Sequence, residues 1–315
     1  MPNVGFPSFD QLKTFVAVAE TGSFSAAARR LRRAQSVVSY AIAQLEQQLG
    51  VSLFDRAGRI PVMNDAGRAL LADARRASAV IDSLRARASG LQSGLEAELK
   101  VAIDVMFPTD TTVGILQALA VEYPTVSLRL WSEALGGVAE LVASGECDLG
   151  ISTELAAMPA SIRQHPIGEV ALIPVAAPHC ALLQNSFPLA REVVQDATQI
   201  VLTDRTALTQ GQDLGVLSLK VWRIGDLSAK LAFLRAGLGW GNMPEPLVRD
   251  DLAAGRLLQL QLEEGRSHSY PLSVIQRGDT VLGPAGQWLA ARFEVAAARL
   301  TAAEAARNVS LSMKG

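Results

Sequence analysis

The first fifty residues contain three apolar patterns with the period of a helix. The first pattern recurs at intervals of three or four residues and consists of Leu12, Phe15, Val16 and Ala19. Ser8 begins a capping box at the start of this helix, and Gly22 ends it. Small side chains over 24–31 predict a second, short helix. A third helix ends at Gly50, and its apolar stripe is Val38, Ile42, Leu45 and Leu49.

The opposite face of the third helix is polar near its N-terminus. With the apolar stripe turned inward, this face presents Gln35, Ser36, Ser39 and Tyr40. Compact hydrogen-bonding groups of this kind can read base edges when a helix end enters a major groove. A basic cluster that suits contact with a DNA backbone precedes the helix and consists of Arg29, Arg30, Arg32 and Arg33. Three short helices also occur without DNA binding, so the pattern up to this point leaves both interpretations open.

Two short extended segments follow the third helix. Residues 51–56 and 59–63 flank a turn at Ala57 and Gly58, which predicts a β-hairpin, or wing. Together with the three helices, this segment resembles the LysR-type transcriptional regulators. The residues that carry the resemblance are Phe15, Gly22, Ser23, Phe24, Ala27, Ala28, Leu31, Val38, Ser39, Leu45, Glu46, Leu49, Gly50, Leu53, Phe54, Asp55 and Arg56. The resemblance is dense over the first 65 residues and loose over the rest of the chain.

The resemblance implies a winged helix-turn-helix whose third helix recognises DNA. It also implies that the arginine after the Leu-Phe pair, Arg56, contacts the DNA backbone. The chain departs from the family at Ser36, where a proline is common, and at Tyr40, where an arginine is common. The operator sequence therefore cannot be inferred from the family. The residues that we expect to contact DNA are Arg29, Arg30, Arg33, Gln35, Ser36, Ser39, Tyr40, Arg56 and Arg59.

A long unbroken helix is predicted from Asn64, a good N-cap, to about residue 89. Its apolar positions alternate in spacing between four and three residues and are Leu70, Ala74, Ala77, Ile81, Leu84, Ala88 and Leu91. This narrow heptad seam favours self-association of two copies, although packing against the chain's own C-terminal body is an alternative. The resemblance implies a dimer through this helix and a dimer of dimers. Two-fold symmetry predicts an inverted-repeat operator.

The C-terminal part of the chain alternates strand and helix patterns. Glycines and serines over 89–94 indicate a hinge. The strands that we predict are 99–103, 126–131, 148–152, 170–176, 199–203, 219–224, 238–241 and 269–276, with helices at 109–122, 227–236 and 288–305 among the helical segments between and after them. Repeated βα units predict parallel sheets covered by helices, and two sets of units predict two lobes. The resemblance implies the type 2 periplasmic-binding-protein architecture, with an effector cleft between the lobes.

These patterns together describe a multidomain α/β protein. The predicted domains are a winged helix-turn-helix over 1–63, a linker helix and hinge over 64–95, an effector-binding domain over 96–305, and a flexible tail over 306–315. Within the effector-binding domain, lobe 1 is expected over about 96–165 and 270–305, and lobe 2 over about 166–269.

Ligands of such sheets bind beyond the C-terminal ends of the strands, where helix N-termini offer unpaired amides. The effector contacts that we expect on this basis are Asp104, Met106, Phe107, Thr109, Glu133, Thr203, Arg223 and Asn242. Two of them, Asp104 and Glu133, are acidic and are expected to face the cleft, which disfavours an anionic ligand unless a cation such as Arg223 intervenes. We therefore expect a neutral or hydroxylated aromatic effector rather than a simple carboxylate.

Charge is divided unevenly along the chain. The net charge is −2, but residues 1–95 contain twelve basic and seven acidic side chains, which gives them +5 and leaves −7 on the rest. A basic end on an acidic body is expected where one end meets phosphate, and a chance excess of bases on solvated helices is the alternative. A length of 315 residues also favours more than one folding unit.

Several classes of protein fit the sequence poorly. The two cysteines, Cys147 and Cys180, and three scattered histidines match neither a disulfide framework nor a metal site, and we expect packing rather than redox sensing from the cysteines. The chain contains no apolar run long enough to span a bilayer and no signal-peptide pattern, so we expect a cytoplasmic protein without membrane contact.

A transcriptional regulator accounts for the wing, the recognition helix, the seam and the charge division together. The alternative is a cytoplasmic α/β protein that binds or converts a small molecule without binding DNA. We find no phosphate-binding glycine loop and no nucleophile elbow, and a solute-binding transport component would need export. We therefore expect a non-enzymatic regulator without metal or cofactor. Its expected partners are double-stranded promoter DNA, a small organic effector, and further copies of itself in a homodimer and homotetramer.

Overall fold

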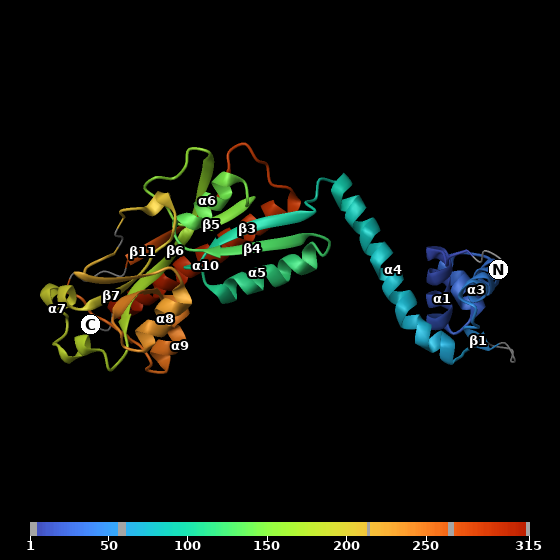
Figure 1. Ribbon diagram of the computed structural model, residues 1–315, viewed down its shortest axis with the longest axis horizontal. Coiled ribbons are helices and arrows are strands. Elements are labelled where there is room, and N and C mark those ends of the chain that lie inside the picture. The colour runs from blue at the N-terminus through green and yellow to red at the C-terminus, as the bar shows by residue number, and fades with distance from the viewer. Residues whose placement is uncertain (1–4, 56–60, 213–214, 264–267, 313–315) are drawn as a thin grey trace. The chain divides into compact units, whose positions relative to one another are not determined.

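The computed structural model describes residues 5–55, 61–212, 215–263 and 268–312. The chain forms two compact units, Met1–Ser93 and Gly94–Gly315 (Figure 1). The first unit consists of helices and one small hairpin, whereas the second is built on a mixed β-sheet with helices packed against it.

The first unit has the three short helices, the hairpin and the long helix that its sequence predicts. Its elements are α1 (Phe9–Thr21), α2 (Phe24–Leu31), α3 (Gln35–Leu49), β1 (Phe54–Asp55), β2 (Val62–Met63) and α4 (Asp65–Gln92). The capping box of α1 is confirmed, because the Gln11 N–H donates to the Ser8 hydroxyl at 3.3 Å and the Gln11 side chain accepts from the Ser8 N–H at 2.6 Å. Gly22 ends α1 with a φ of 66°, a left-handed conformation that favours glycine.

The apolar faces of α1, α2 and α3 meet in one core, which also receives the first strand of the wing. The rings of Phe15 and Phe54 pack edge to face with their centroids 5.7 Å apart. The Glu46 carboxylate, on α3, accepts the N–H groups of Leu53 and Phe54 at 2.8 and 3.2 Å. The antiparallel pairing of β1 with β2 confirms the hairpin. α3 thus also fixes where the hairpin begins.

Within the described residues of the second unit, nine strands form one sheet. The order across it is β4-β3-β5-β11-β6-β9-β7-β8, and β10 pairs with β6. The strands are β3 (Glu98–Asp104), β4 (Ser127–Glu133), β5 (Leu149–Ser152), β6 (Ile162–Ala176), β7 (Thr198–Leu202), β8 (Lys220–Ile224), β9 (Trp240–Pro244), β10 (Leu258–Gln259) and β11 (His268–Arg277). β3 pairs in parallel with β4 and β5, and β7 pairs in parallel with β8 and β9, which confirms the two predicted parallel sets.

Two long antiparallel strands join these parallel sets. β6 pairs with β11 and β9, and β11 also pairs with β5. The sequence predicts only residues 170–176 of β6, because Pro166 and Gly168 interrupt its apolar pattern. The strand continues through both residues, and its register with β11 shifts between Leu272 and Ser273. The boundary that we expected between the lobes, near residue 165, therefore falls inside a continuous strand.

The helices of the second unit pack against this sheet. They are α5 (Thr109–Glu122), α6 (Gly136–Ser144), α7 (Arg191–Asp196), α8 (Leu227–Arg235), α9 (Glu245–Ala253) and α10 (Pro284–Ser312), with 3-10 turns at Ala181–Gln184 and Ala207–Thr209. α10 packs against β6 and α5 and brings the Phe293 ring within 5.3 Å of the Phe107 ring, centroid to centroid. α10 continues to Ser312, so the tail expected to be flexible from residue 306 is helical that far. In the described part of the chain, no helix is both long and apolar enough to cross a membrane.

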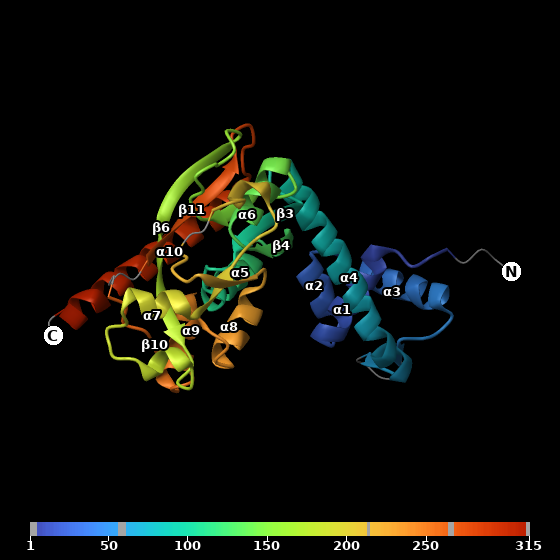
Figure 2. The same cartoon turned by 60° about the vertical axis from the view of Figure 1, so that its left-hand side comes forward.

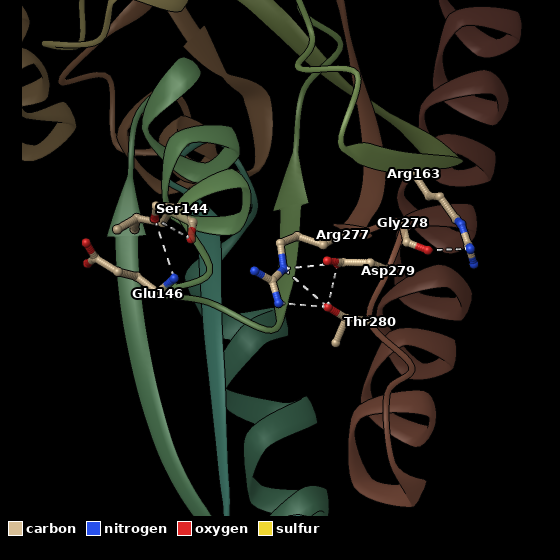
Figure 3. Close-up of polar contacts among 8 residues, drawn as sticks. Ser144, Glu146, Arg163, Arg277, Gly278, Asp279 and Thr280 are labelled. Carbon is tan, nitrogen blue, oxygen red and sulfur yellow. Dashed lines mark hydrogen bonds and ion pairs between the residues drawn. The ribbon is translucent and has the colours of Figure 1, made fainter.

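Hydrogen bonds hold the loop that leads from β11 to α10 (Figure 3). The Arg277 guanidinium donates to the Thr280 hydroxyl at 3.1 and 3.2 Å, and the Arg163 guanidinium donates to the Gly278 carbonyl. At the other end of the loop, the Glu96 carboxylate accepts two N–H groups in the first turn of α10 at 3.1 and 2.9 Å. A carboxylate at this end of a helix is favourable, so these contacts anchor α10 beside the start of β3.

Candidate nucleic-acid interface and ligand cavity

α3 is one of the helices of the first unit (Figure 2). Its N-terminal half carries the side chains that the sequence predicts to read DNA, and most of them are exposed. The buried residues of the helix are Val38, Ala41, Ile42 and Leu45. Gln35, Ser36 and Tyr40 are exposed, with Tyr40 at 67%, and Ser39 is half-buried beside them. The helix therefore has an apolar face in the core and a polar edge that is free to meet a partner.

The start of α3 is suited to an anion. Ala34 occupies the N-cap position and supplies no side-chain hydrogen bond to the first turn. N–H groups in the first turn of a helix favour phosphate, because they carry the positive end of the helix dipole. The Gln35 side chain accepts from the Ser25 hydroxyl at 2.9 Å, so α2 helps to orient the first side chain of α3.

Two arginines of the basic cluster are held by acidic residues of α1. Arg33 forms a two-pronged ion pair with Asp10 at 2.5 and 2.7 Å, and Arg30 pairs with Glu20 at 2.7 Å. The hydrogen bonds from Arg33 hold the pKa of Asp10 below its usual value. These guanidinium groups connect the segment before α3 to α1, a structural role that the sequence pattern did not indicate.

The other arginines near α3 have no such partners. Within the described residues, the exposed side chains of Arg29 and Arg32 form neither a hydrogen bond nor an ion pair. Arg32 ends α2 in a left-handed conformation with a φ of 53°. Arg56 and Arg59, two of the expected DNA contacts, lie outside the described residues. The positive charges available to a partner therefore include Arg32, which we did not count among the expected contacts.

The expected seam of α4 divides into two parts. Leu70 and Ala74 pack in the core of the first unit, because α1 lies against this part of α4. Ala74 is buried there and Leu70 is half-buried, so the core of their own unit covers much of this part of the seam. Further along the helix, the seam residues Leu84 and Leu91 are 64% and 52% exposed, and Val80, which was not part of the predicted seam, is 67% exposed. The remaining seam residues are half-buried or exposed and are Ala77, Ile81 and Ala88.

The second unit contains a cavity of about 520 Å³. Residues of β6, β7, β9 and β11 line it, together with segments that follow β3 and β5 and the residue before α6. The apolar residues on its walls include Met106, Leu135, Leu155, Leu172, Ile200 and Leu202. Its volume falls in the range of small-molecule sites, which are mostly apolar with a few polar groups.

Two of the eight expected effector contacts, Met106 and Asn242, line this cavity. The other six are not among its lining residues and are Asp104, Phe107, Thr109, Glu133, Thr203 and Arg223. The rule that ligands bind at strand ends points to the edge of the sheet where this cavity lies. It does not identify which side chains face the ligand, because successive side chains of a strand point to opposite faces.

Asp104 lies behind the cavity wall instead of facing a ligand. Its carboxylate accepts the N–H of Met106 at 2.8 Å, the O–H of Tyr270 at 2.7 Å and the N–H of Leu135. Complete burial raises the pKa of Asp104 to about 7, and these hydrogen bonds oppose the increase. Because Tyr270 itself lines the cavity, Asp104 orients part of the wall and does not present a free carboxylate.

Lys230 is a lining residue that we did not expect from the sequence. It lies on α8, is only 3% exposed, and donates from Nζ to the carbonyl oxygen of Asn242 at 2.7 Å. Burial lowers the pKa of this lysine to about 8. The sequence does indicate that Lys230 is buried, because this lysine interrupts the helical apolar stripe of Leu227, Leu231 and Leu234. A cation within such a stripe indicates a buried ammonium group.

Asp204, in the loop after β7, binds the first turn of α6 beside the cavity. Its carboxylate accepts the N–H of Gly136 at 2.5 Å, the hydroxyl of Thr206 at 3.1 Å, and the hydroxyl of Thr209. A Cβ at Gly136 would lie 2.3 Å from the Thr206 hydroxyl oxygen, so this approach requires glycine. Leu135, at the start of α6, has a φ of 49°, which is strained for a residue other than glycine. A carboxylate of the expected second lobe is thus bonded to a helix of the first.

The two cysteines are buried in separate clusters of the core. Burial raises the pKa of the Cys147 thiol to about 12, which keeps it protonated and unreactive. Within the described residues, no group of three His, Cys, Asp or Glu side chains is placed to hold a metal ion.

Two family models match the chain. Residues 9–68 match a model described as a bacterial regulatory helix-turn-helix protein of the lysR family, and residues 92–297 match a model of the LysR substrate binding domain. The first match covers α1–α3, the wing and the start of α4. The second begins at the end of α4 and covers most of the sheet-containing unit, including the cavity.

Relatives with similar sequences carry the names of HTH-type transcriptional regulators. The chain is 31% identical over 252 residues to the HTH-type transcriptional activator AllS of Klebsiella pneumoniae, an overlap of 79% of this chain and 93% of that protein. It is 29% identical over 257 residues to the probable HTH-type transcriptional regulator YhaJ of Escherichia coli K12, an overlap of 79% and 84%. The oxidized form of Corynebacterium glutamicum OxyR matches in fold, with a TM-score of 0.50 and 22% identity over 96% of this chain and 95% of that one.

Proposed function

The chain belongs to the LysR family of bacterial helix-turn-helix regulators, and from this premise we propose that α3 reads an operator while a small organic ligand in the cavity adjusts that binding. The observation that carries the proposal is the polar edge of α3, which is exposed on a helix whose other face is buried.

Each group at this edge has a chemical role in the proposal. Gln35, oriented by Ser25, can pair with adenine through its amide, and Ser39 and Tyr40 can reach base edges or phosphate. The uncapped start of α3, at Ser36, receives a phosphate. The unpaired cations Arg29 and Arg32 neutralise the neighbouring backbone. Arg30 and Arg33, which are tied to acidic residues of α1, instead keep α2 and α3 in place.

We assign the exposed apolar residues of α4 to an interface with a second copy of the chain. Val80, Leu84 and Leu91 follow one another at helical spacing on a part of α4 that the core of the first unit does not cover. An isologous contact of this kind gives a two-fold dimer that presents two α3 helices to an inverted repeat. The family resemblance extends this proposal to a dimer of dimers.

The cavity is proposed as the regulatory site because of where Asp204 lies. Its bonds to Gly136, Thr206 and Thr209 connect segments on two sides of the cavity. A ligand that binds one arrangement of these segments more tightly shifts the equilibrium between arrangements, and the dimer transmits that shift to α3. The ligand and the DNA are then coupled without touching each other.

Replacing Arg29 with alanine should weaken binding to every duplex alike, because an unpaired arginine at this place contacts phosphate rather than bases. We expect the slope of log affinity against log salt to fall by about one. The measurement is fluorescence anisotropy of a random duplex and of a duplex selected by the protein, each across a salt series.

Arg33→Ala is the matched comparison. It should lower the melting temperature, because Asp10 loses its partner, and should change the salt slope less than Arg29→Ala does. If the slope of log affinity against log salt were the same for the wild type and Arg29→Ala, Arg29 would not contact DNA. If the wild-type protein bound no duplex at any salt concentration, the proposed function itself would be wrong.

A further inference from the structure

We propose that the cavity selects small organic monoanions and that the ammonium group of Lys230 provides their countercharge. This inference depends on the proposed function in one respect only, namely that the cavity is a ligand site. It replaces the neutral effector that the sequence led us to expect, because neither Asp104 nor Glu133 lines the cavity.

The fold brings Lys230 to the cavity by a specific route. The lysine lies on the face of α8 that packs against the sheet, beside the buried residues Leu227 and Leu234. Its side chain passes Gly241, where a Cβ would lie 3.3 Å from Lys230 Cε and 2.5 Å from the Ile200 carbonyl oxygen. The absence of a side chain at Gly241 therefore leaves room for the lysine, whose Nζ ends at the Asn242 carbonyl.

Among the described residues, no acidic side chain forms an ion pair with the Lys230 ammonium group. Within the described residues that line the cavity, the only carboxylate belongs to Glu154, which is exposed, and no ion pair involves Lys230. Burial lowers the pKa of Lys230, and no charged group among the described residues is a further cause. Asp104 is already bonded to Tyr270, and Asp204 is bonded to the start of α6.

An ammonium group has three N–H donors, and the hydrogen bond to Asn242 uses one of them. A buried charge without a partner is costly, so a ligand carboxylate that accepts the remaining donors would gain a charge-assisted hydrogen bond. Gln199 does not compete for the ligand, because its amide is bonded to the backbone of Gly215, Leu217 and Ser218.

The other residues that line the cavity indicate the apolar body and the number of charges of the ligand. Leu172, Leu202 and Met106 offer apolar surface, which suits a hydrocarbon body. The described lining residues contain one lysine and no arginine, which matches one negative charge better than two. The ligand class is therefore a monocarboxylate with an apolar body that fits a cavity of about 520 Å³.

The test is calorimetric titration of the full-length protein with two matched pairs of probes, benzoate with benzamide and hexanoate with hexanamide. Each pair has the same body and differs in charge. We expect at least one carboxylate to bind about ten-fold or more tightly than its amide, a difference of about 1.4 kcal/mol. Lys230→Met should abolish that preference. Lys220→Met, at an exposed lysine on β8, should retain it.

Three results would overturn the inference. They are amides that bind as well as the carboxylates, a carboxylate preference that survives in Lys230→Met, and the failure of both carboxylates to bind the wild type at about 10 mM. The wild-type comparison holds even if Lys230→Met does not fold. DNA binding is measured separately on the same proteins. If the wild type binds DNA but does not prefer carboxylates, only this inference is wrong. If it prefers carboxylates but does not bind DNA, only the regulator proposal is wrong.

Discussion

Replacing Val80 and Leu84 together with lysine should convert the proposed homodimer into monomers and weaken operator binding by about 100-fold or more. Both side chains are exposed on α4 and apolar, so in the proposed interface they are buried against their copies. Lysines there would place four positive charges in one contact between two helices, which desolvation and repulsion oppose. A monomer can bind only one half of an inverted repeat. It therefore lacks the higher affinity that two linked DNA-binding domains have for the whole repeat.

The measurements are sedimentation velocity for the oligomeric state and anisotropy with full and half operators. Asp82→Lys is a suitable control, because it changes the charge of the chain by the same amount. Asp82 lies two residues from both positions, on the opposite side of the helix. The control should remain dimeric. A double variant that still sediments as a dimer would show that the copies meet elsewhere.

Asp204→Ala should release the loop after β7 from α6 and reduce the free energy of unfolding by about 2–4 kcal/mol. The carboxylate accepts from Gly136, Thr206 and Thr209, and its removal leaves all three donors without this partner. The amide proton of Gly136 should exchange about 100-fold faster with solvent, because that N–H donates to Asp204. Thermal unfolding and hydrogen exchange measure the two effects.

Asp226→Ala provides the comparison for this prediction. Asp226 caps α8 and accepts the N–H of Ala229 at 2.6 Å, away from the start of α6. Its loss should cost about 1 kcal/mol and leave exchange at Gly136 unchanged. Unchanged exchange at Gly136 in Asp204→Ala would mean that the carboxylate does not hold the two segments together.

The first unit could be predicted well from its sequence because its signals are local. The capping box at Ser8, the glycine that ends α1 and the apolar stripe of α3 each involve residues within one or two helical turns. The seam of α4 was predicted less accurately. Leu70 and Ala74 fit a heptad as well as Leu84 does, and only the structure shows that they pack against the core of their own unit.

The second unit shows what a sequence pattern cannot supply. The parallel sets around β3 and β7 follow from repeated βα units, but β6 was recognised only in part because Pro166 and Gly168 hide its first half. Its long pairing with β11 is a contact between distant segments, for which the local pattern carries no signal.

The cavity was located at the correct strand ends, yet most of its lining residues were missed. Asp104 has the type and position of a ligand contact, and only burial and the bond to Tyr270 reveal its structural role. Lys230, in contrast, could have been predicted to be buried, because its position within the apolar stripe of α8 is visible in the sequence. Once these two residues were placed, the inferred ligand changed from a neutral molecule to a monoanion.

The most direct test of the central claim compares the wild type with Ser39→Ala/Tyr40→Ala on an operator duplex selected by the protein. Both side chains lie on the polar edge of α3. Gln47→Ala, at an exposed position near the other end of α3, is the control. Anisotropy should show about ten- to 100-fold weaker operator binding for the double variant, with random-duplex binding and dimerisation unchanged. Equal operator affinity in a folded, dimeric double variant would contradict the assignment of α3 as the reading helix.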